Sequence, residues 1–458
     1  MKKKGIIIAS TGSGTGKTTL TLAIAGALRR RGVKVAPFKC GPDYLDPTYL
    51  SRVTGRECEN LDPWMMGESA LEEVFYSAME GADFALIEGV MGLFDGVGGR
   101  EEGSTAHVAA LLGLPVVLVI DASGMSATAG AIFHGLREFR KDINIVALIC
   151  NRVAGKPHRR MLEDAAGRDF FLGAIPRMEE CLTFKSRHLG LLRADRRALT
   201  DETIEALTEL AEAHIDVARL IELAAPLRGE KGWTPCATGD EYSVRIAIAK
   251  DEAFHFYYPY NLKLLEAFGA ELVEFSPLKD RGLPEGVDGL YIGGGYPECF
   301  AEELSENKSM LQAIRDASLS GMPVYGECGG LMYLTEGVRL TDGKFFPMAG
   351  VLEAECVMHK RLKALGYVEV ETTEDSIAGP SGTHMRGHQF RYSELVPKGR
   401  INRVYRVRTV RTGELTEEGY RACNLLASYV HVHWAYSKDV PENFVKACQS
   451  YRRQRCHG

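Results

Sequence analysis

The sequence lacks paired cysteines, a basic excess and a long apolar run. Its 11 cysteines are scattered over 458 residues and are never spaced as CxxC, so neither a disulfide framework nor a zinc ribbon is predicted. A net charge of −6 argues against a general nucleic-acid-binding protein. The apolar run in "MKKKGIIIAS" is too short for a signal peptide or a membrane span. We therefore expect a protein of the reducing cytoplasm that binds neither nucleic acid nor membrane.

What is present indicates an α/β protein with two domains. Hydrophobic residues make up 45% of the chain, and glycine is abundant at 49 residues. Runs such as "GIIIAS", "DFALIEGV" and "LPVVLVID" are typical of strands in a parallel sheet that is covered by helices on both faces. A polar segment rich in Gly and Pro, "RGEKGWTPCATGDEYS", is followed by a second α/β series that begins at "VRIAIAKD". We predict domains at residues 1–230 and 243–458.

The first glycine-rich loop is typical of a phosphate-binding P-loop. In "GIIIASTGSGTGKTTL" a strand, a glycine loop and a helix follow one another in the order that a nucleotide site requires. Lys17 is expected to reach the terminal phosphates, and the Thr18 hydroxyl is expected to bind Mg²⁺. Thr11 occupies a position where the standard motif has glycine. The alternative is an ordinary glycine-rich turn at the start of a helix.

Acidic residues follow the next predicted strands and favour an ATP–Mg²⁺ site. The segments "GPDYLDP" and "IEGVMGLFDG" begin where strands of a parallel sheet would end at one edge. Taken singly, each carboxylate could equally be a solvated turn residue; together they favour Mg²⁺ held with nucleotide phosphates. Nucleotide binding is assigned to Gly12, Gly14, Thr15, Gly16, Lys17, Thr18, Thr19, Asp43, Asp46 and Asp95. The metal is assigned to Thr18, Asp43 and Glu88.

The stretch "MPVYGECGGLMYL" predicts a nucleophile elbow around Cys328, in which a strand, a tight turn and a helix present the thiol. The helix N-terminus would favour the thiolate. The alternative is a small residue packed at a turn. The loop "YIGGGYPE", residues 291–298, could supply oxyanion-hole N–H groups.

A catalytic base for Cys328 is expected near the C-terminus. The β-like stretch "LLASYVHVHW" carries His431 and His433, which would point to one face of a single strand. Either histidine could therefore approach the thiol.

The motifs taken together carry a family resemblance. "GSGTGKTT", "PFKCGPDYLDP", "IEGVMGLFDG", "SRHLGL", "AFHFYYPYNL", "YIGGGYPE", "YGECGGLMYL" and "ASYVHVHW" stand in the order of the cobyrinate a,c-diamide synthase family. The chain resembles this family over essentially its whole length. The resemblance implies a dethiobiotin-synthetase-like ATP domain followed by a class I glutamine amidotransferase domain.

The reaction that the resemblance implies is ATP-dependent amidation of the a and c acetate groups of cobyrinic acid, with ammonia from glutamine. Cys328 would attack the glutamine amide, and His431 would be its helper histidine. In most class I amidotransferases a Glu follows that histidine by two positions, whereas His433 stands there in this chain. What orients the imidazole is therefore open, and a modest glutaminase activity is expected. The resemblance is compatible with a homodimer, and "FKSRHLGL" offers Lys185, Arg187 and His188 to a substrate with several carboxylates.

Several alternatives stay open at this level. Ni-sirohydrochlorin a,c-diamide synthases have the same domains and motifs, and a hydrogenobyrinate-type substrate is a further option. A protein of another class, a P-loop switch with a degenerate second domain, would not need the elbow. A metal-delivery protein would depend on His384, His388, His431 and His433, whose spacing is loose.

Overall fold

The computed structural model describes residues 3–177, 199–229 and 243–457, with side chains up to residue 455. The chain divides into two compact units, Met1–Thr234 and Pro235–Gly458. The predicted linker falls mostly outside the described residues, and the domain boundaries stay a prediction. Each unit is an α/β fold, which confirms the predicted fold class.

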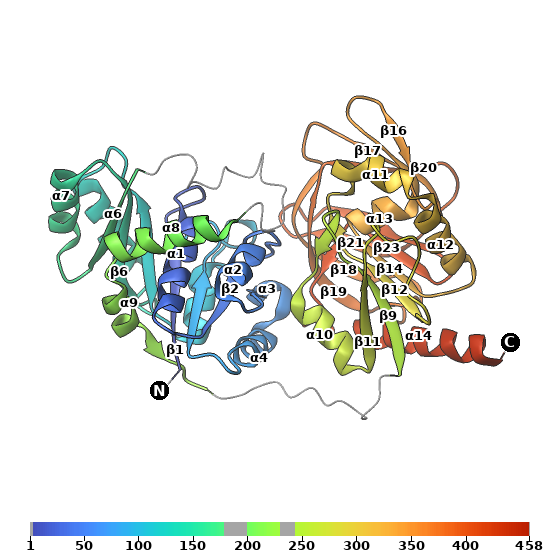
Figure 1. The fold of residues 1–458 in the computed structure, drawn as a ribbon, viewed down its shortest axis with the longest axis horizontal. Coiled ribbons are helices and arrows are strands. Elements are labelled where there is room, and N and C mark those ends of the chain that lie inside the picture. Colours follow the sequence, from blue (N-terminus) through green and yellow to red (C-terminus); the bar gives the residue numbers. More distant parts are fainter. Residues whose placement is uncertain (1–2, 178–198, 230–242, 458) are drawn as a thin grey trace. The chain divides into compact units, whose positions relative to one another are not determined.

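A parallel sheet forms the centre of the first unit (Figure 1). Its strand order is β3-β2-β4-β1-β5-β6-β7, and β8 (Ala225–Pro226) pairs antiparallel with β1. The other strands are β1 (Lys4–Ser10), β2 (Val35–Cys40), β3 (Glu59–Leu61), β4 (Phe84–Glu88), β5 (Val116–Asp121), β6 (Ile145–Val153) and β7 (Phe171–Pro176). Burial on both faces explains why these strands are apolar runs rather than alternating patterns.

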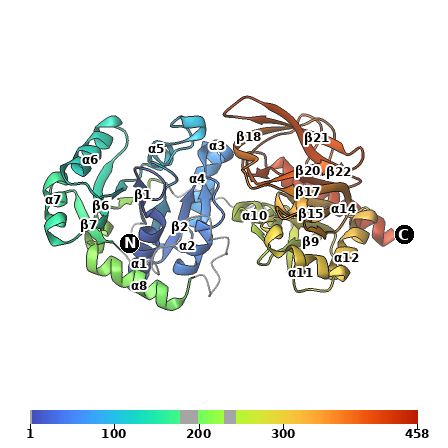
Figure 2. The same ribbon diagram turned by 90° about the horizontal axis from the view of Figure 1, so that it is seen from above.

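Helices lie on both sides of this sheet, with α5 and α8 on opposite sides in Figure 2. The helices are α1 (Lys17–Arg30), α2 (Asp46–Thr54), α3 (Pro63–Met66), α4 (Glu68–Ala78), α5 (Thr105–Leu112), α6 (Ala127–Phe139), α7 (Lys156–Ala166), α8 (Asp201–His214) and α9 (Val217–Leu223). Apolar side chains of α1, α2, α8 and α9 form one cluster with alternate residues of β1, including Ile6 and Ile8. The parallel arrangement brings the carboxyl ends of β1, β2 and β4 to one edge, next to the start of α1.

The second unit has a sheet whose strands are parallel at one end and antiparallel at the other. The order is β11-β9-β12-β14-β23-β22-β21-β18-β19-β24. The parallel strands are β9 (Val244–Ala249), β11 (Ala270–Phe275), β12 (Gly289–Ile292), β14 (Val324–Glu327) and β23 (Leu425–Ser428). The antiparallel ones are β18 (Ala364–Thr372), β19 (His384–Arg391), β21 (Asn402–Thr409), β22 (Leu415–Ala422) and β24 (His431–Val432). The chain leaves the parallel part at Ser428, the end of β23, and pairs with β19 from His431 onward.

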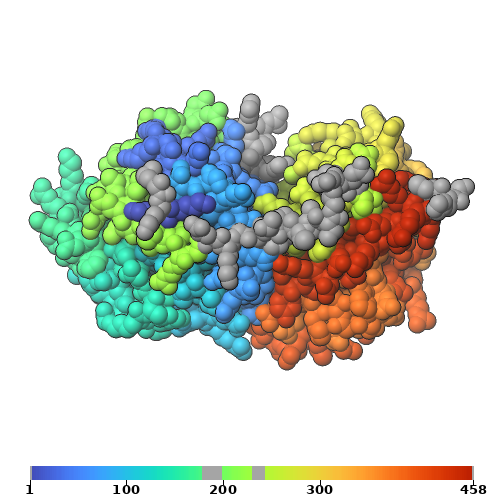
Figure 3. Space-filling model, turned by 90° about the horizontal axis from the view of Figure 1, so that it is seen from below, coloured from blue at the N-terminus to red at the C-terminus, as the bar shows by residue number. Residues whose placement is uncertain are grey.

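Smaller elements complete the second unit. β10 (Phe254–Phe256) pairs with β13 (Gly294–Gly295), and a separate sheet has the order β16-β15-β17-β20. The strands of that sheet are β15 (Thr335–Arg339), β16 (Phe345–Pro347), β17 (Leu352–Met358) and β20 (Ser393–Pro397). The helices are α10 (Pro259–Ala267), α11 (Ala301–Glu306), α12 (Lys308–Leu319), α13 (Gly329–Leu334) and α14 (Asp439–His457). α14 packs against α10 and extends across the face of this unit that Figure 3 shows in red. Among the described residues, no helix has both the length and the apolar character needed to cross a membrane.

Candidate active sites

The glycine-rich loop of the first unit joins β1 to α1 in the predicted order. Gly14 and Gly16 have φ values of 77° and 93°, a backbone region that glycine enters at little cost. Lys17, the first residue of α1, is buried, and its Nζ donates to Ser10 Oγ at 2.8 Å and to the carbonyl oxygen of Met91 at 2.6 Å. The ammonium group therefore lies within the loop that would surround phosphates.

The end of β6 holds the same loop from the other side. Asn151 Nδ2 donates to the carbonyl oxygen of Thr15 at 2.8 Å, and Arg152 Nη2 donates to that of Gly14 at 3.0 Å. A Cβ atom on Gly16 would lie 2.3 Å from Asn151 Nδ2, so the contact requires glycine there. Neither Asn151 nor Arg152 was predicted from the sequence, because only their position at the end of a strand indicates that they are near the loop.

A buried charged cluster lies beside the first turn of α1. Thr18 Oγ1 donates to Glu88 Oε1 at 2.6 Å and to Asp46 Oδ2 at 3.3 Å. Lys39 Nζ donates to the same two oxygens, at 2.6 Å each. Lys39 and Glu88 are opposite each other in the register of β2 and β4. Lys39 was not predicted, because a lysine inside an apolar strand run carries no signal of its own.

The cluster fits a magnesium ion that is also bound to phosphates. Burial raises the pKa of Glu88 to about 7 despite the neighbouring ammonium group. Burial alone would lower the pKa of Lys39, but the Asp46 and Glu88 carboxylates outweigh it and raise that pKa. Glu88 Oε2 is buried and has no hydrogen-bond partner among the described residues. Together with Thr18 and Asp46 it offers the oxygen ligands that Mg²⁺ takes beside substrate phosphates.

Two predicted acidic residues have different local contacts. Asp43 Oδ1 accepts from the backbone N–H groups of Leu45 and Asp46, at 2.9 and 3.0 Å. Asp95 Oδ2 accepts from the N–H of Gly92 at 3.0 Å. Both carboxylates thus stabilise turns after strands. Of the predicted acidic residues, Glu88 and Asp46 accept from the Thr18 hydroxyl, and the assignment of Asp43 to the metal stays a prediction.

The remaining predicted residues of this unit divide between loop and helix. Thr15 Oγ1 donates to the Gly12 carbonyl oxygen at 3.2 Å, and Thr19 is buried in α1. Lys185, Arg187 and His188 lie outside the described residues.

Cys328 of the second unit forms a strained elbow between β14 and α13. Its φ and ψ are 48° and −99°, which a non-glycine residue adopts only where surrounding structure enforces it. Its N–H donates to the Ser428 carbonyl oxygen at 2.7 Å. A Cβ atom on Gly330 would lie 2.0 Å from the carbonyl oxygen of Ile292. Close packing around the turn therefore requires glycine after the cysteine.

The Cys328 thiol is buried, and burial opposes the thiolate that a helix N-terminus would favour. Cys328 is 8% exposed. Burial raises the pKa of its thiol, and the Glu298 carboxylate raises it further. The α13 helix has only 6 residues, so its dipole does not offset desolvation. Deprotonation then depends on a base.

His431 lies in β24 and faces Glu327, the residue before the nucleophile. His431 Nδ1 is 3.9 Å from Glu327 Oε2, and both side chains are almost fully buried. Burial lowers the pKa of His431 to about 3 and raises that of Glu327 to about 8. A neutral imidazole beside the elbow is able to accept a thiol proton. Glu327 was not predicted as a site residue.

His433 has a different environment from His431, contrary to the expectation of one continuous strand. β23 ends at Ser428 and β24 contains only His431 and Val432. The His433 ring packs against Tyr258 in a tilted arrangement and is stacked with Tyr260, with centroid distances of 4.6 and 6.2 Å. Because β24 ends at Val432, the alternation of a strand does not extend to His433, and the two rings have different neighbours.

The loop predicted as an oxyanion hole packs directly on the elbow. A Cβ atom on Gly329 would lie 3.0 Å from the Gly295 backbone nitrogen. One on Gly294 would lie 2.3 Å from His431 Cε1. The loop thus packs against both the elbow and the histidine. Its backbone N–H groups are close enough to be candidates for stabilising an oxyanion.

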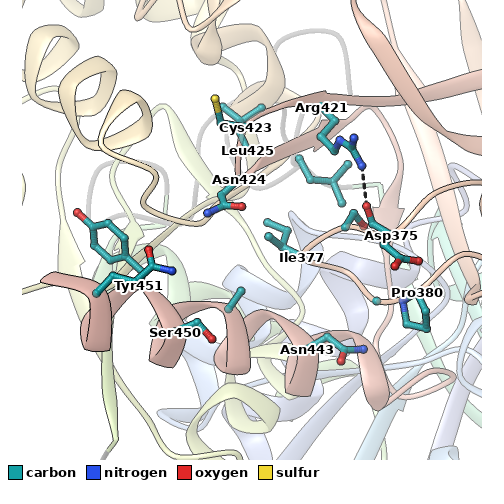
Figure 4. Close-up of a pocket in the computed structure, with 15 residues that line it drawn as sticks. Asp375, Ile377, Pro380, Arg421, Cys423, Asn424, Leu425, Asn443, Ser450 and Tyr451 are labelled. Carbon is teal, nitrogen blue, oxygen red and sulfur yellow. Dashed lines mark hydrogen bonds between the residues drawn. The ribbon is translucent and has the colours of Figure 1, made fainter. Parts of the chain in front are cut away.

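A pocket of about 580 Å³ lies elsewhere in this unit (Figure 4). Its lining includes Arg421, Asn424 and Leu425 at the start of β23, whereas Ser428 at the other end of that strand contacts the elbow. Arg421 Nη1 donates to the Asp375 carbonyl oxygen at 2.6 Å across its rim. The pocket is therefore separate from the candidate site.

The histidines of the metal-delivery hypothesis do not form a metal site. His388 pairs with His431 in the register of β19 and β24, and His384 is exposed. In the parts of the chain that the structure describes, no group of three or more His, Cys, Asp or Glu side chains is arranged to hold a metal ion alone.

Comparison with known proteins assigns a family to each half of the chain. Residues 6–192 match the CobQ/CobB/MinD/ParA nucleotide binding domain, and residues 245–439 match the CobB/CobQ-like glutamine amidotransferase domain. Among solved structures, PurLQS from Thermotoga maritima has a TM-score of 0.34 and 14% identity, and covers 45% of this chain and 98% of its own. FtsY from Elizabethkingia anophelis has a TM-score of 0.29 and 17% identity, and covers 39% of this chain and 58% of its own.

Sequence relatives match both halves together. The cobyrinate a,c-diamide synthase of Leptospira interrogans serovar copenhageni is 46% identical over 97% of this chain and 98% of its own length. The cobyrinate a,c-diamide synthase of Syntrophotalea carbinolica is 43% identical over 97% of this chain and 98% of its own length. That of Priestia megaterium is 38% identical over 99% of both chains. The chain therefore belongs to the cobyrinate a,c-diamide synthase family.

Proposed function

We propose that this chain is an ATP-dependent, glutamine-hydrolysing ligase that amidates the a and c acetate groups of cobyrinic acid. The observation that carries the proposal is the full-length match to cobyrinate a,c-diamide synthases at up to 46% identity. The buried cluster of the first unit and the cysteine elbow of the second support it, because each half of the reaction has its own residues. A P-loop switch protein has no use for the second set.

In the first unit, the loop N–H groups and Lys17 would bind the ATP phosphates. Thr18, Asp46 and Glu88 would hold Mg²⁺, which supplies charge neutralisation to the phosphates when bound. The substrate carboxylate would attack the terminal phosphorus, giving an acyl phosphate and ADP. Ammonia would then displace phosphate and form the amide.

In the second unit, Cys328 would supply that ammonia. The thiol proton passes to His431 as sulfur attacks the glutamine amide carbon, and the same proton leaves on ammonia as the thioester forms. Water then hydrolyses the thioester to glutamate and restores the thiol. The N–H of Gly295, which packs on the elbow, would stabilise the oxyanion, whereas the N–H of Gly293 donates to Tyr257 Oη at 2.8 Å. We expect this chemistry in the cytoplasm, and a homodimer remains a prediction that light scattering tests.

The test is mass spectrometry of products after incubation with ATP, Mg²⁺ and glutamine. Cobyrinic acid, hydrogenobyrinic acid and Ni-sirohydrochlorin are offered in separate reactions. Two successive conversions of OH to NH₂ on cobyrinic acid are expected. Amidation of Ni-sirohydrochlorin or hydrogenobyrinic acid alone would move the proposal to that substrate, and no amidation of any would overturn it.

A further inference from the structure

His431, the histidine of the proposed glutaminase site, is followed two positions later by His433 rather than by the glutamate expected in most class I amidotransferases, but a carboxyl group faces it from another direction. Glu327 Oε2 lies 3.9 Å from His431 Nδ1. Glu327 is the residue immediately before Cys328, so its backbone is part of the elbow. One residue thus connects the nucleophile to the base.

The Glu327 side chain is fixed by hydrogen bonds from the neighbouring strand β12, from its own strand β14 and from the histidine segment. Tyr291 Oη donates to Oε2 at 3.1 Å, and Tyr325 Oη donates to Oε1 at 3.2 Å. The N–H of Val432, next to His431, donates to Oε1 at 3.2 Å. The carboxyl group is therefore placed by the fold rather than by solvent, as a positioning residue must be.

His433 stands at the position where most class I amidotransferases are expected to have a glutamate, and its side chain has other contacts than Glu327. His433 Nδ1 accepts from the N–H of Ala435 at 3.3 Å, and its ring packs against Tyr258 at a tilted angle. His433 therefore has a packing role in this structure.

We propose that Glu327 is the positioning residue of the glutaminase site, with its carboxyl oxygen accepting from His431 Nδ1–H so that Nε2 is presented to the Cys328 thiol. The proposal rests on the glutaminase activity proposed above. The 3.9 Å separation is longer than a hydrogen bond, and such contacts commonly shorten once substrate is bound. When Nε2 takes the thiol proton, the imidazolium charge faces the Glu327 carboxyl group, and this positive charge lowers the pKa of the carboxyl group toward the ionised form that stabilises the imidazolium.

The experiment measures glutamine hydrolysis and ammonia-dependent amidation by the full chain carrying Glu327→Gln. We expect kcat for glutamine to fall about 100-fold and KM to change less than about threefold. Amidation with free ammonia should stay at the wild-type rate. A substitution that only damaged the fold of the second unit would have a different signature. It would abolish glutamine binding and lower the unfolding temperature, rather than lower kcat alone.

Two matched variants make the result specific. Glu418→Gln removes another buried carboxylate of the same unit, which accepts from the N–H of Tyr429 at 3.0 Å and from Gln389 Nε2 at 2.9 Å. His433→Gln tests the rival position. Both should keep kcat within about threefold of wild type. Wild-type kcat in Glu327→Gln, or an equal loss in Glu418→Gln or His433→Gln, would overturn the proposal. Absence of glutamine hydrolysis in the wild type would instead overturn the proposed function.

Discussion

Lys39 Nζ lies 2.6 Å from Glu88 Oε1 in the interior of the first unit, and the same ammonium group lies 2.6 Å from Asp46 Oδ2. The exposed fractions of the Lys39 and Glu88 side chains are 4% and 0%. The Asp46 and Glu88 carboxylates approach each other closely because the Lys39 ammonium group compensates their charges. Without that compensation, burying two like charges would cost free energy of folding.

We expect Lys39→Met to destabilise the first unit by about 3 kcal/mol, since it leaves buried carboxylates without their counter-ion. Glu88→Gln should also destabilise, whereas the double variant should recover part of the loss because no unpaired charge is left. Denaturant unfolding of the four proteins gives the coupling energy. A coupling energy near zero would show that the pair is not energetically linked.

The two half-reactions should be separable by single substitutions. Cys328→Ala is expected to abolish glutamine-dependent amidation and to leave amidation with free ammonia unchanged. Lys17→Ala is expected to abolish both, because neither nitrogen source replaces the ATP step. Product formation with each nitrogen source, measured on the same preparations, checks the pair. Glutamine use by Cys328→Ala would contradict the elbow assignment.

The sequence was sufficient for features that are local in the chain. The strand–loop–helix order around Lys17 and the elbow at Cys328 follow from residues within a few positions of each other. The parallel strands were visible because burial on both faces makes them apolar runs. These are properties of one segment and need no knowledge of its neighbours.

Contacts between distant segments could not be predicted. Lys39 and Glu88 are 49 positions apart, and Glu327 and Val432 are 105 apart, so only the strand order reveals that they meet. The stretch "LLASYVHVHW" predicts one strand from its composition, but its two ends pair with β14 and β19. That change of partner is set by the sheet and not by local propensity.

Packing at the elbow makes a prediction about stability. We expect Gly330→Ala to destabilise the second unit by at least about 2 kcal/mol, because the new Cβ atom would lie 2.0 Å from the backbone oxygen of Ile292. Gly282→Ala is the control in the same unit, since nothing lies within 4 Å of its Cβ position. Denaturant midpoints of the two variants and the wild type test this. Equal midpoints would show that the elbow adjusts at little cost.

The ionisation of Glu327 predicts a stability change with a definite sign. Burial raises its pKa from 4.5 to about 8, so between these pH values the folded chain keeps a proton that the unfolded chain has lost. The free energy of unfolding therefore falls as pH rises through this window, by the contribution of this group.

Glu327→Gln removes that contribution. The difference in unfolding temperature between Glu327→Gln and the wild type should rise between pH 5 and pH 8.5. Burial raises the pKa of Glu298 to about 7, so the corresponding difference for Glu298→Gln should rise as well and should level off at a lower pH. A variant that is less active with glutamine yet more stable than wild type at pH 8.5 would separate positioning from structural support, because a residue needed only for folding would lose both together. A difference in unfolding temperature that does not change with pH would show that Glu327 is already ionised in the folded chain at pH 5.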